Sequence, residues 1–113
     1  MAILAFALPI VAGQLEDARQ LGAELDRTGH RARYEELNSR AGITRHLEWV
    51  ETGEAGDLLI VVFETDTPER LARPFEDNEY DRWWQARFER LHGFHPASSP
   101  GVAPELTFSW RSS

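Results

Sequence analysis

The stretch Asp57-Leu58-Leu59-Ile60-Val61-Val62-Phe63-Glu64 decides the fold that this sequence predicts. It has the length of a β-strand, and successive side chains of a strand point to opposite faces of the sheet. Leu58, Ile60 and Val62 therefore share one face, and the apolar residues between them share the other. Because both faces are apolar, both must be covered, which is typical of a strand at the centre of a sheet.

Three other segments have strand patterns. Residues 2–10 are apolar on both faces, like the central strand. Residues 43–51 and 105–110 alternate between apolar and polar side chains, which is typical of half-buried strands near a sheet edge. In residues 43–51 we expect one buried face to carry Ile43, Leu47 and Trp49.

The first helical region follows Gly13. Apolar residues with a rough period of 3.6 predict a long helix that extends to about Ser39. Gly29 lies in its middle, where we expect a kink, and Gly42 is placed to end it.

The second helical region begins at residues 67–69, is interrupted at Pro74, and starts again around Asp77 and Asn78. This helix runs from Glu79 to His92 and is predicted to end at Gly93. Its apolar side chains form a single stripe, which must face the sheet. The stripe consists of Tyr80, Trp84, Phe88 and Leu91. We expect it to meet the sheet face that carries Phe6 and Trp49.

The resulting order is β-α-β-β-α-β, the ferredoxin-like unit, in a single domain over residues 1–113. We expect an α+β fold with a four-stranded antiparallel sheet and two helical segments on one face. Its central strands are then the first and third, which agrees with their two apolar faces. The other face of the sheet needs a cover, and a second copy of the chain would supply it. The sequence therefore predicts a homodimer.

This arrangement resembles the dimeric α+β barrel superfamily, in which two ferredoxin-like sheets pack face to face. Residues 56–64, the run Tyr80-Asp81-Arg82-Trp83-Trp84 and the run Leu91-His92-Gly93 are similar to an uncharacterised bacterial branch of it. The resemblance implies a pocket between sheet and helices. Relatives include cofactor-independent quinol monooxygenases, muconolactone isomerases, haem-binding proteins and stress-responsive proteins. No catalytic motif of theirs matches this chain residue by residue.

Composition excludes several classes of function. The net charge of −7, without a basic cluster, argues against nucleic-acid binding. The chain has no cysteine, so thiolate chemistry and disulfides are excluded. The apolar N-terminal stretch lacks a basic start, is closed by Pro9 and is too short to span a bilayer. We therefore expect a cytoplasmic protein that contacts neither membrane nor nucleic acid.

The aromatic residues are the first candidates for a binding site. They would line an apolar pocket for a flat, ring-shaped ligand, with Arg87 and His92 at its rim. The alternative is that they only fill the core. The candidate ligand-binding residues are Phe6, Trp49, Tyr80, Trp84, Arg87 and Phe88.

His92 and His46 are the candidate catalytic bases. A structural role competes in both cases, because His92 would meet the negative end of a helix dipole and His46 would lie on an exposed edge strand. No motif for a haem or a metal site is present, so we expect neither a cofactor nor a bound metal.

Two classes of function follow from the sequence. One is a small-molecule enzyme of the monooxygenase or isomerase type, acting on an apolar aromatic compound. The other is a non-catalytic, stress-related or structural dimer. An open cavity lined by a histidine and an arginine would favour the enzyme, and a closed core would favour the second class.

Overall fold

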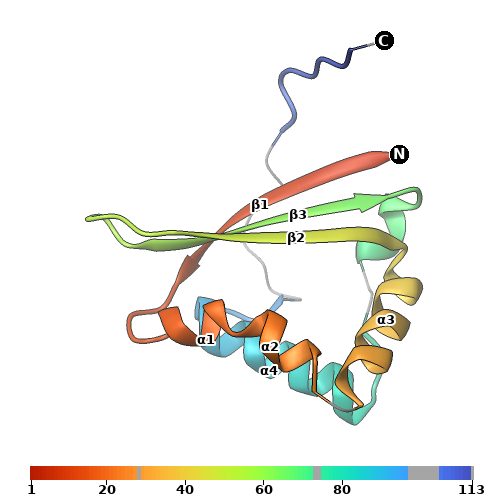
Figure 1. The fold of residues 1–113 in the computed structure, drawn as a ribbon. Coiled ribbons are helices and arrows are strands. Elements are labelled where there is room, and N and C mark those ends of the chain that lie inside the picture. Colours follow the sequence, from red (N-terminus) through yellow and green to blue (C-terminus); the bar gives the residue numbers. More distant parts are fainter. Residues whose placement is uncertain (28, 73–74, 97–104, 113) are drawn as a thin grey trace.

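A three-stranded antiparallel sheet forms one layer of the computed structural model, which describes residues 1–27, 29–72, 75–96 and 105–112. Its strands are β1 (Ala2–Ile10), β2 (Ile43–Glu51) and β3 (Asp57–Thr65). Their order across the sheet is β1-β3-β2, so β3 is central, as its two apolar faces predict (Figure 1).

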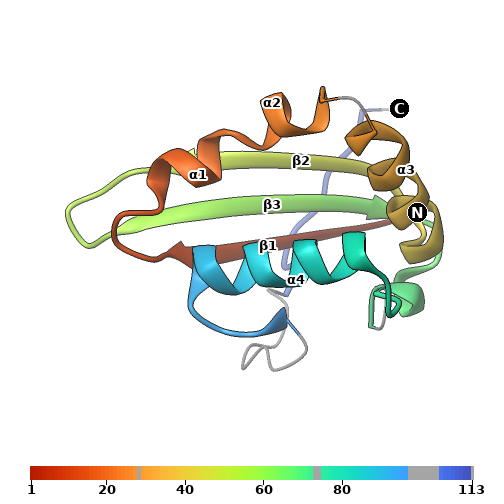
Figure 2. The ribbon, with the colours of Figure 1, turned by 90° about the horizontal axis from the view of Figure 1, so that it is seen from below.

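All of the described helices lie on one face of this sheet (Figures 1 and 2). The segments α1 (Leu15–Arg19) and α2 (Leu21–Leu25) run beneath β2, and α4 (Glu79–His92) runs beneath β1. Helix α3 (His30–Ala41) lies at one end of the sheet, and the short 3-10 helix η1 (Pro68–Ala72) follows β3. None of the helices among the described residues has the length and apolar character needed to cross a membrane.

The predicted helix boundaries are confirmed where glycine sets them. Gly29 has a φ of 84° and separates α3 from the two short segments before it, so the predicted long helix is broken rather than kinked. Gly42, with a φ of 75°, ends α3, and Gly93, with a φ of 80°, ends α4. These left-handed conformations favour glycine because it has no Cβ atom.

The predicted fourth strand is absent from the described structure. Residues 105–110 have no regular secondary structure and extend away from the sheet, on the side opposite to the helices (Figure 1). Among the described residues the sheet therefore has three strands instead of four, and β1 lies at its edge instead of at its centre. A short alternating segment needs a neighbouring strand edge to become a strand, and here no described strand is paired with it.

The register shows which side chains share a face, because directly opposed residues point the same way. Phe6 lies opposite Val61, and Val61 lies opposite Glu48, on the face that the helices cover. Trp49 belongs to the other face, and its side chain is 51% exposed. The prediction that Phe6 and Trp49 meet beneath the helices is therefore wrong.

A β-bulge explains this error. Ile43 pairs with Thr65, whereas Arg45 pairs with Glu64, so Thr44 is an extra residue in β2. A bulge of one residue reverses the faces of all positions after it. Ile43 thus remains on the helix side, while Leu47 and Trp49 turn to the open face.

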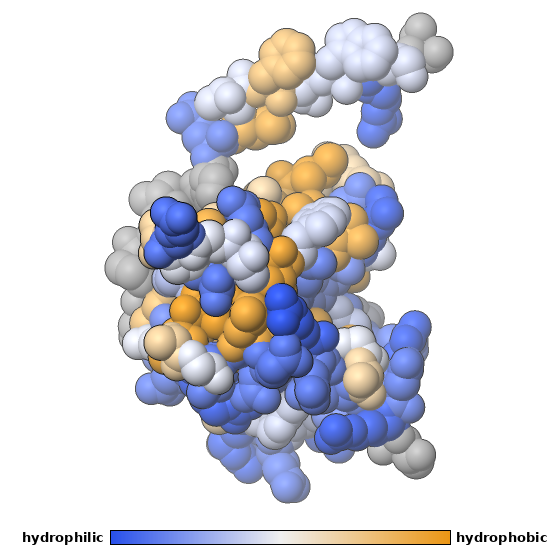
Figure 3. Space-filling model, turned by 60° about the vertical axis from the view of Figure 1, so that its left-hand side comes forward, coloured by the Kyte–Doolittle hydropathy of each residue, from blue (hydrophilic) through white to orange (hydrophobic). Residues whose placement is uncertain are grey.

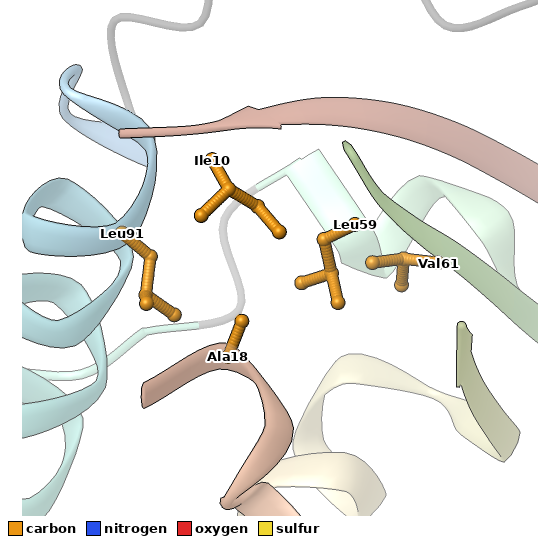
Figure 4. Close-up of a cluster of buried hydrophobic side chains, with 5 residues drawn as sticks. All are labelled: Ile10, Ala18, Leu59, Val61 and Leu91. Carbon is orange, nitrogen blue, oxygen red and sulfur yellow. The ribbon is translucent and has the colours of Figure 1, made fainter. Parts of the chain in front are cut away.

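The main core lies between the sheet and helices α1 and α4 (Figure 4). Its buried members are Ile10, Ala18, Leu59, Val61 and Leu91. The amide of Val11 donates a hydrogen bond of 2.8 Å to the carbonyl of Leu91, which joins the end of β1 to the end of α4. The Tyr80–Trp84–Phe88–Leu91 stripe predicted from sequence reaches full burial only at Leu91.

The opposite face of the sheet, the open face, is also largely apolar. No described helix covers it (Figure 1). Charged side chains occur on it at Arg45, Glu51 and Glu64, near the strand ends. Its apolar residues are Ile3, Ala5, Ala7, Pro9, Leu47, Trp49, Leu58, Ile60 and Val62.

Candidate functional site

A cleft of about 330 Å³ opens between the edge strand β2 and the first helical segments. This volume lies at the lower end of the range of small-molecule sites. Apolar side chains come from α1, α2, β2 and β3, and polar groups come from α3, from β2 and from Arg19 at the end of α1. The lining residues are Ala18, Arg19, Leu21, Gly22, Leu25, Tyr34, His46, Glu48, Trp49, Val50 and Leu59.

Three of the lining residues form a continuous hydrogen-bonded chain. The Tyr34 hydroxyl is hydrogen-bonded to Nδ1 of His46. Nε2 of His46 lies 2.7 Å from Oε2 of Glu48. A phenol, an imidazole and a carboxylate are thus linked in a row along one wall of the cleft.

The bulge in β2 places two of these groups in the cleft. His46 and Glu48 are two positions apart on the strand, so both side chains point to the helix side. Tyr34 reaches them from α3, and its ring packs against Trp84 with centroids 5.8 Å apart. The His46 ring packs on Phe63 at 4.9 Å. Aromatic neighbours therefore hold both rings in place.

The electrostatics of this chain assign its protons. Burial raises the pKa of the Tyr34 phenol, an effect that the nearby Glu48 charge reinforces and a hydrogen bond with Asn38 opposes. The hydroxyl therefore stays protonated at neutral pH and can donate to His46. Because the Glu48 carboxylate only accepts hydrogen bonds, Nε2 of His46 carries the ring proton and Nδ1 accepts from Tyr34.

Such a chain can accept and return one proton. The imidazole can take up the phenolic proton while the carboxylate stabilises the resulting imidazolium. Arg19 adds a positive charge to the same lining, although its Nη1 is 2.7 Å from Oε1 of Glu16. The cleft therefore combines apolar walls with an acid–base group and a cation.

Trp49 and His46 are the two sequence candidates that border this cleft. Phe6 lies on the same sheet face as His46, but it packs edge to face with Phe63 at 6.1 Å and joins the core. Tyr80 contacts His30 instead, with its hydroxyl 3.1 Å from Nδ1.

The remaining aromatic and basic candidates do not line the cleft and contact neighbouring side chains instead. Arg87 is buried, and its Nε lies 3.4 Å from Oε2 of Glu24, an ion pair between α4 and α2. Its guanidinium also lies over Trp84, 5.3 Å from the ring centroid. Phe88 packs edge to face with Phe94 at 5.3 Å.

His92 lies outside the cleft. Its Nδ1 is 2.7 Å from the carbonyl oxygen of Pro9, and its ring packs against Phe88 at 4.7 Å. Burial lowers the pKa of His92, and the hydrogen bond to Pro9 only partly offsets this effect. The side chain therefore links the end of α4 to β1 as a neutral imidazole.

Tyr34, Glu48 and Arg19 are the site residues that the sequence did not reveal. The available signal was the pair His46 and Glu48 at a spacing of two, which puts two polar groups on one strand face. Nothing local indicated that this face lies beneath the helices. Among the described residues, no group of three His, Cys, Asp or Glu side chains is arranged to hold a metal ion.

No protein-family model matches the chain, and no match was found among curated proteins or among solved structures.

Proposed function

We propose that the protein binds a small, largely apolar ring compound in the cleft and catalyses a proton transfer on it. The observation that carries this proposal is the hydrogen-bonded chain Tyr34–His46–Glu48 on the cleft wall. The cleft lining also supports the proposal, because it contains both a histidine, His46, and an arginine, Arg19.

The reaction type that these side chains suit best is an isomerisation of a cyclic carbonyl compound. The oxygen of Tyr34 removes a proton from the carbon next to the carbonyl while its own proton passes to His46. The same chain of side chains then returns a proton to a different carbon of the same molecule. Atoms and electrons balance without a second substrate. General acid–base catalysis of this kind contributes roughly 10²–10⁴-fold in rate. A monooxygenase-type reaction would begin with a similar proton removal and would use dioxygen as the oxidant.

We also propose that the protein is a homodimer of the α+β barrel type, with two open faces packed against each other. Support comes from the apolar residues of the open face, which include the exposed Ile3 and Trp49. Soluble monomers commonly expose single apolar residues, whereas the apolar residues of the open face are adjacent and form one continuous patch.

The alternative is a non-catalytic dimer, and one observation favours it. Tyr34, His46 and Glu48 satisfy one another's hydrogen-bonding groups, so the chain also works as a structural link between α3 and β2. The cleft would then be a packing defect at the sheet edge, and any ring compound would bind weakly.

A matched pair of tyrosine variants separates these two functions. Tyr34 and Tyr80 are both partly buried, both have a raised pKa because of burial, and both are hydrogen-bonded to Nδ1 of a histidine. Only Tyr34 lines the cleft. Tyr34→Phe and Tyr80→Phe therefore remove equivalent hydroxyls, one inside the site and one outside it.

The assay uses α-angelica lactone as the probe in D₂O, with NMR detection of deuterium uptake next to the carbonyl. We expect the protein to accelerate uptake over buffer, and Tyr34→Phe and His46→Gln to reduce the acceleration by about 100-fold. Tyr80→Phe should retain it. Binding of 2-naphthol, followed by tryptophan fluorescence, should be saturable and should weaken in His46→Gln.

Absence of both deuterium uptake and 2-naphthol binding in the folded protein would support the non-catalytic alternative. Equal loss in both tyrosine variants would assign the effect to folding rather than to the cleft. Far-UV circular dichroism of each variant provides that control.

A further inference from the structure

We propose that residues 105–110 form the fourth strand on a second copy of the chain, where they pair with the free edge of β1. The inference rests on the proposed homodimer and is independent of the chemistry proposed for the cleft. In this arrangement each copy of the dimer supplies the fourth strand of the other copy's sheet.

The first observation is the free edge of β1. Among the described strands, β1 pairs with β3 only, so its second edge presents unpaired backbone groups. The nine residues of β1, AILAFALPI, include no charged side chain. The other edge strand, β2, carries Arg45, Glu48 and Glu51. Exposed edge strands are commonly protected by charges, so the uncharged edge of β1 indicates a covering strand.

The second observation is the pattern of residues 105–110. Leu106, Phe108 and Trp110 alternate with Thr107 and Ser109, which puts the apolar side chains on one face of an extended segment. These three side chains are 72%, 79% and 77% exposed. Residues 105–110 thus have the pattern of a half-buried strand, but their apolar face is not buried against any described part of the chain.

The third observation is where this segment lies. It stands off the sheet on the side of the open face and is not paired with β1 of its own chain (Figure 1). Hydrophobic side chains stand out among polar ones on the segment, and others gather on the part of the body that faces it (Figure 3). In a dimer of packed open faces, that space is occupied by the second copy. The segment is therefore placed to reach the partner's sheet.

The apolar area that residues 105–110 would bury on the second copy is large enough to stabilise a dimer. Phe108 and Trp110 would together bury roughly 300–500 Å². Each partner of a stable interface of standard size buries about 800 Å². The exchanged segments would thus supply a large share of the interface, and the open faces would supply the remainder.

Cross-linking between different chains tests the exchange directly, because the natural chain has no cysteine. Ala5→Cys, labelled with ¹⁵N, and Ser109→Cys, unlabelled, are unfolded, mixed and refolded together. A short bismaleimide is then added, and the linked peptides are identified by mass spectrometry. We expect a link between position 5 of one chain and position 109 of the other.

The double variant Ala5→Cys/Ser109→Cys tests whether the segment pairs with β1 of its own chain. If the segment pairs with its own β1, this protein gives an internally linked monomer on a denaturing gel, and the exchange is refuted. Single-cysteine proteins, treated alone, identify links between equivalent positions.

A pair of charge variants supplies an independent readout. Phe108→Asp should raise the dimer dissociation constant at least tenfold, measured by sedimentation at several concentrations. Thr107→Asp, on the other face of the same segment, should leave the constant within about twofold. If Phe108→Asp leaves it unchanged, the exchange is wrong. A dimer that persists with only internal links would refute the exchange and leave the homodimer itself standing.

Discussion

Asp81 shows how a single residue organises the helix side of the molecule. Its side chain is 1% exposed and accepts two hydrogen bonds from Arg40, at 2.8 and 3.0 Å. The amide of Glu76 donates a third, at 2.7 Å. Burial acts to raise the pKa of Asp81, but Arg40 and the Glu76 amide outweigh it and hold the pKa below its usual value. The carboxylate thus joins α3 to the start of α4.

We predict that Asp81→Asn lowers the free energy of unfolding at pH 7 by about 3 kcal/mol, because it removes one partner of a buried ion pair. Asp77→Asn is the matched control. Asp77 precedes the same helix and pairs with Arg82, but its side chain is 94% exposed, so little change is expected. Urea unfolding measures both values.

The same pair of variants predicts a pH dependence. Because the pKa of Asp81 is lower in the folded state, its contribution is complete above the unfolded pKa of about 4 and is lost as pH falls through the folded pKa. The difference between the natural protein and Asp81→Asn should therefore shrink below pH 4. A difference that stays constant from pH 7 to pH 2.5 would contradict this assignment.

At the scale of elements, the turn after α3 depends on one close approach. Gly42 has a left-handed backbone, and a Cβ atom there would overlap Oγ1 of Thr67. Thr67 follows β3, and its amide donates to Oγ1 of Thr65 at 3.0 Å. The end of α3 is therefore packed directly on the turn that leaves the central strand.

We predict that Gly42→Ala destabilises the protein more than Gly29→Ala does. Both positions have a positive φ, so both variants should lose roughly 1–2 kcal/mol through backbone strain. At Gly29 an added Cβ meets nothing within 4 Å, whereas at Gly42 it also displaces a stiff, β-branched threonine. Thermal unfolding of the two variants measures the difference, and equal losses would disprove the close approach.

At the scale of the whole molecule, the open face and residues 105–110 both expose apolar side chains. We predict that the protein sediments at about twice the chain mass of 12.9 kDa at micromolar concentration. Leu47→Glu, on the β2 side of the open face, should shift it toward the monomer, because a charge would be buried without a partner. Thr44→Glu, at the exposed bulge in β2, is the control. A stable, soluble monomer of the natural protein would remove the basis for the barrel.

The sequence alone determined the features that depend on neighbours along the chain. The doubly apolar run of β3 predicted the central strand, and the glycines at 42 and 93 predicted two helix ends. Asn78 predicted the start of α4, where its side chain accepts from the Asp81 amide at 2.8 Å. Strand alternation and helix capping act over a few residues, so they can be recognised without tertiary structure.

Only the tertiary structure decided the site and the sheet edge. The bulge at Thr44 reversed the faces of β2, which brought His46 and Glu48 beneath the helices and put Trp49 on the open face. Tyr34 then met His46 across the contact between α3 and β2. Residues 105–110 had a strand pattern but no strand to pair with in the described structure. Register, bulges and strand pairing depend on contacts between segments that are distant in the sequence, so a local sequence pattern does not predict them.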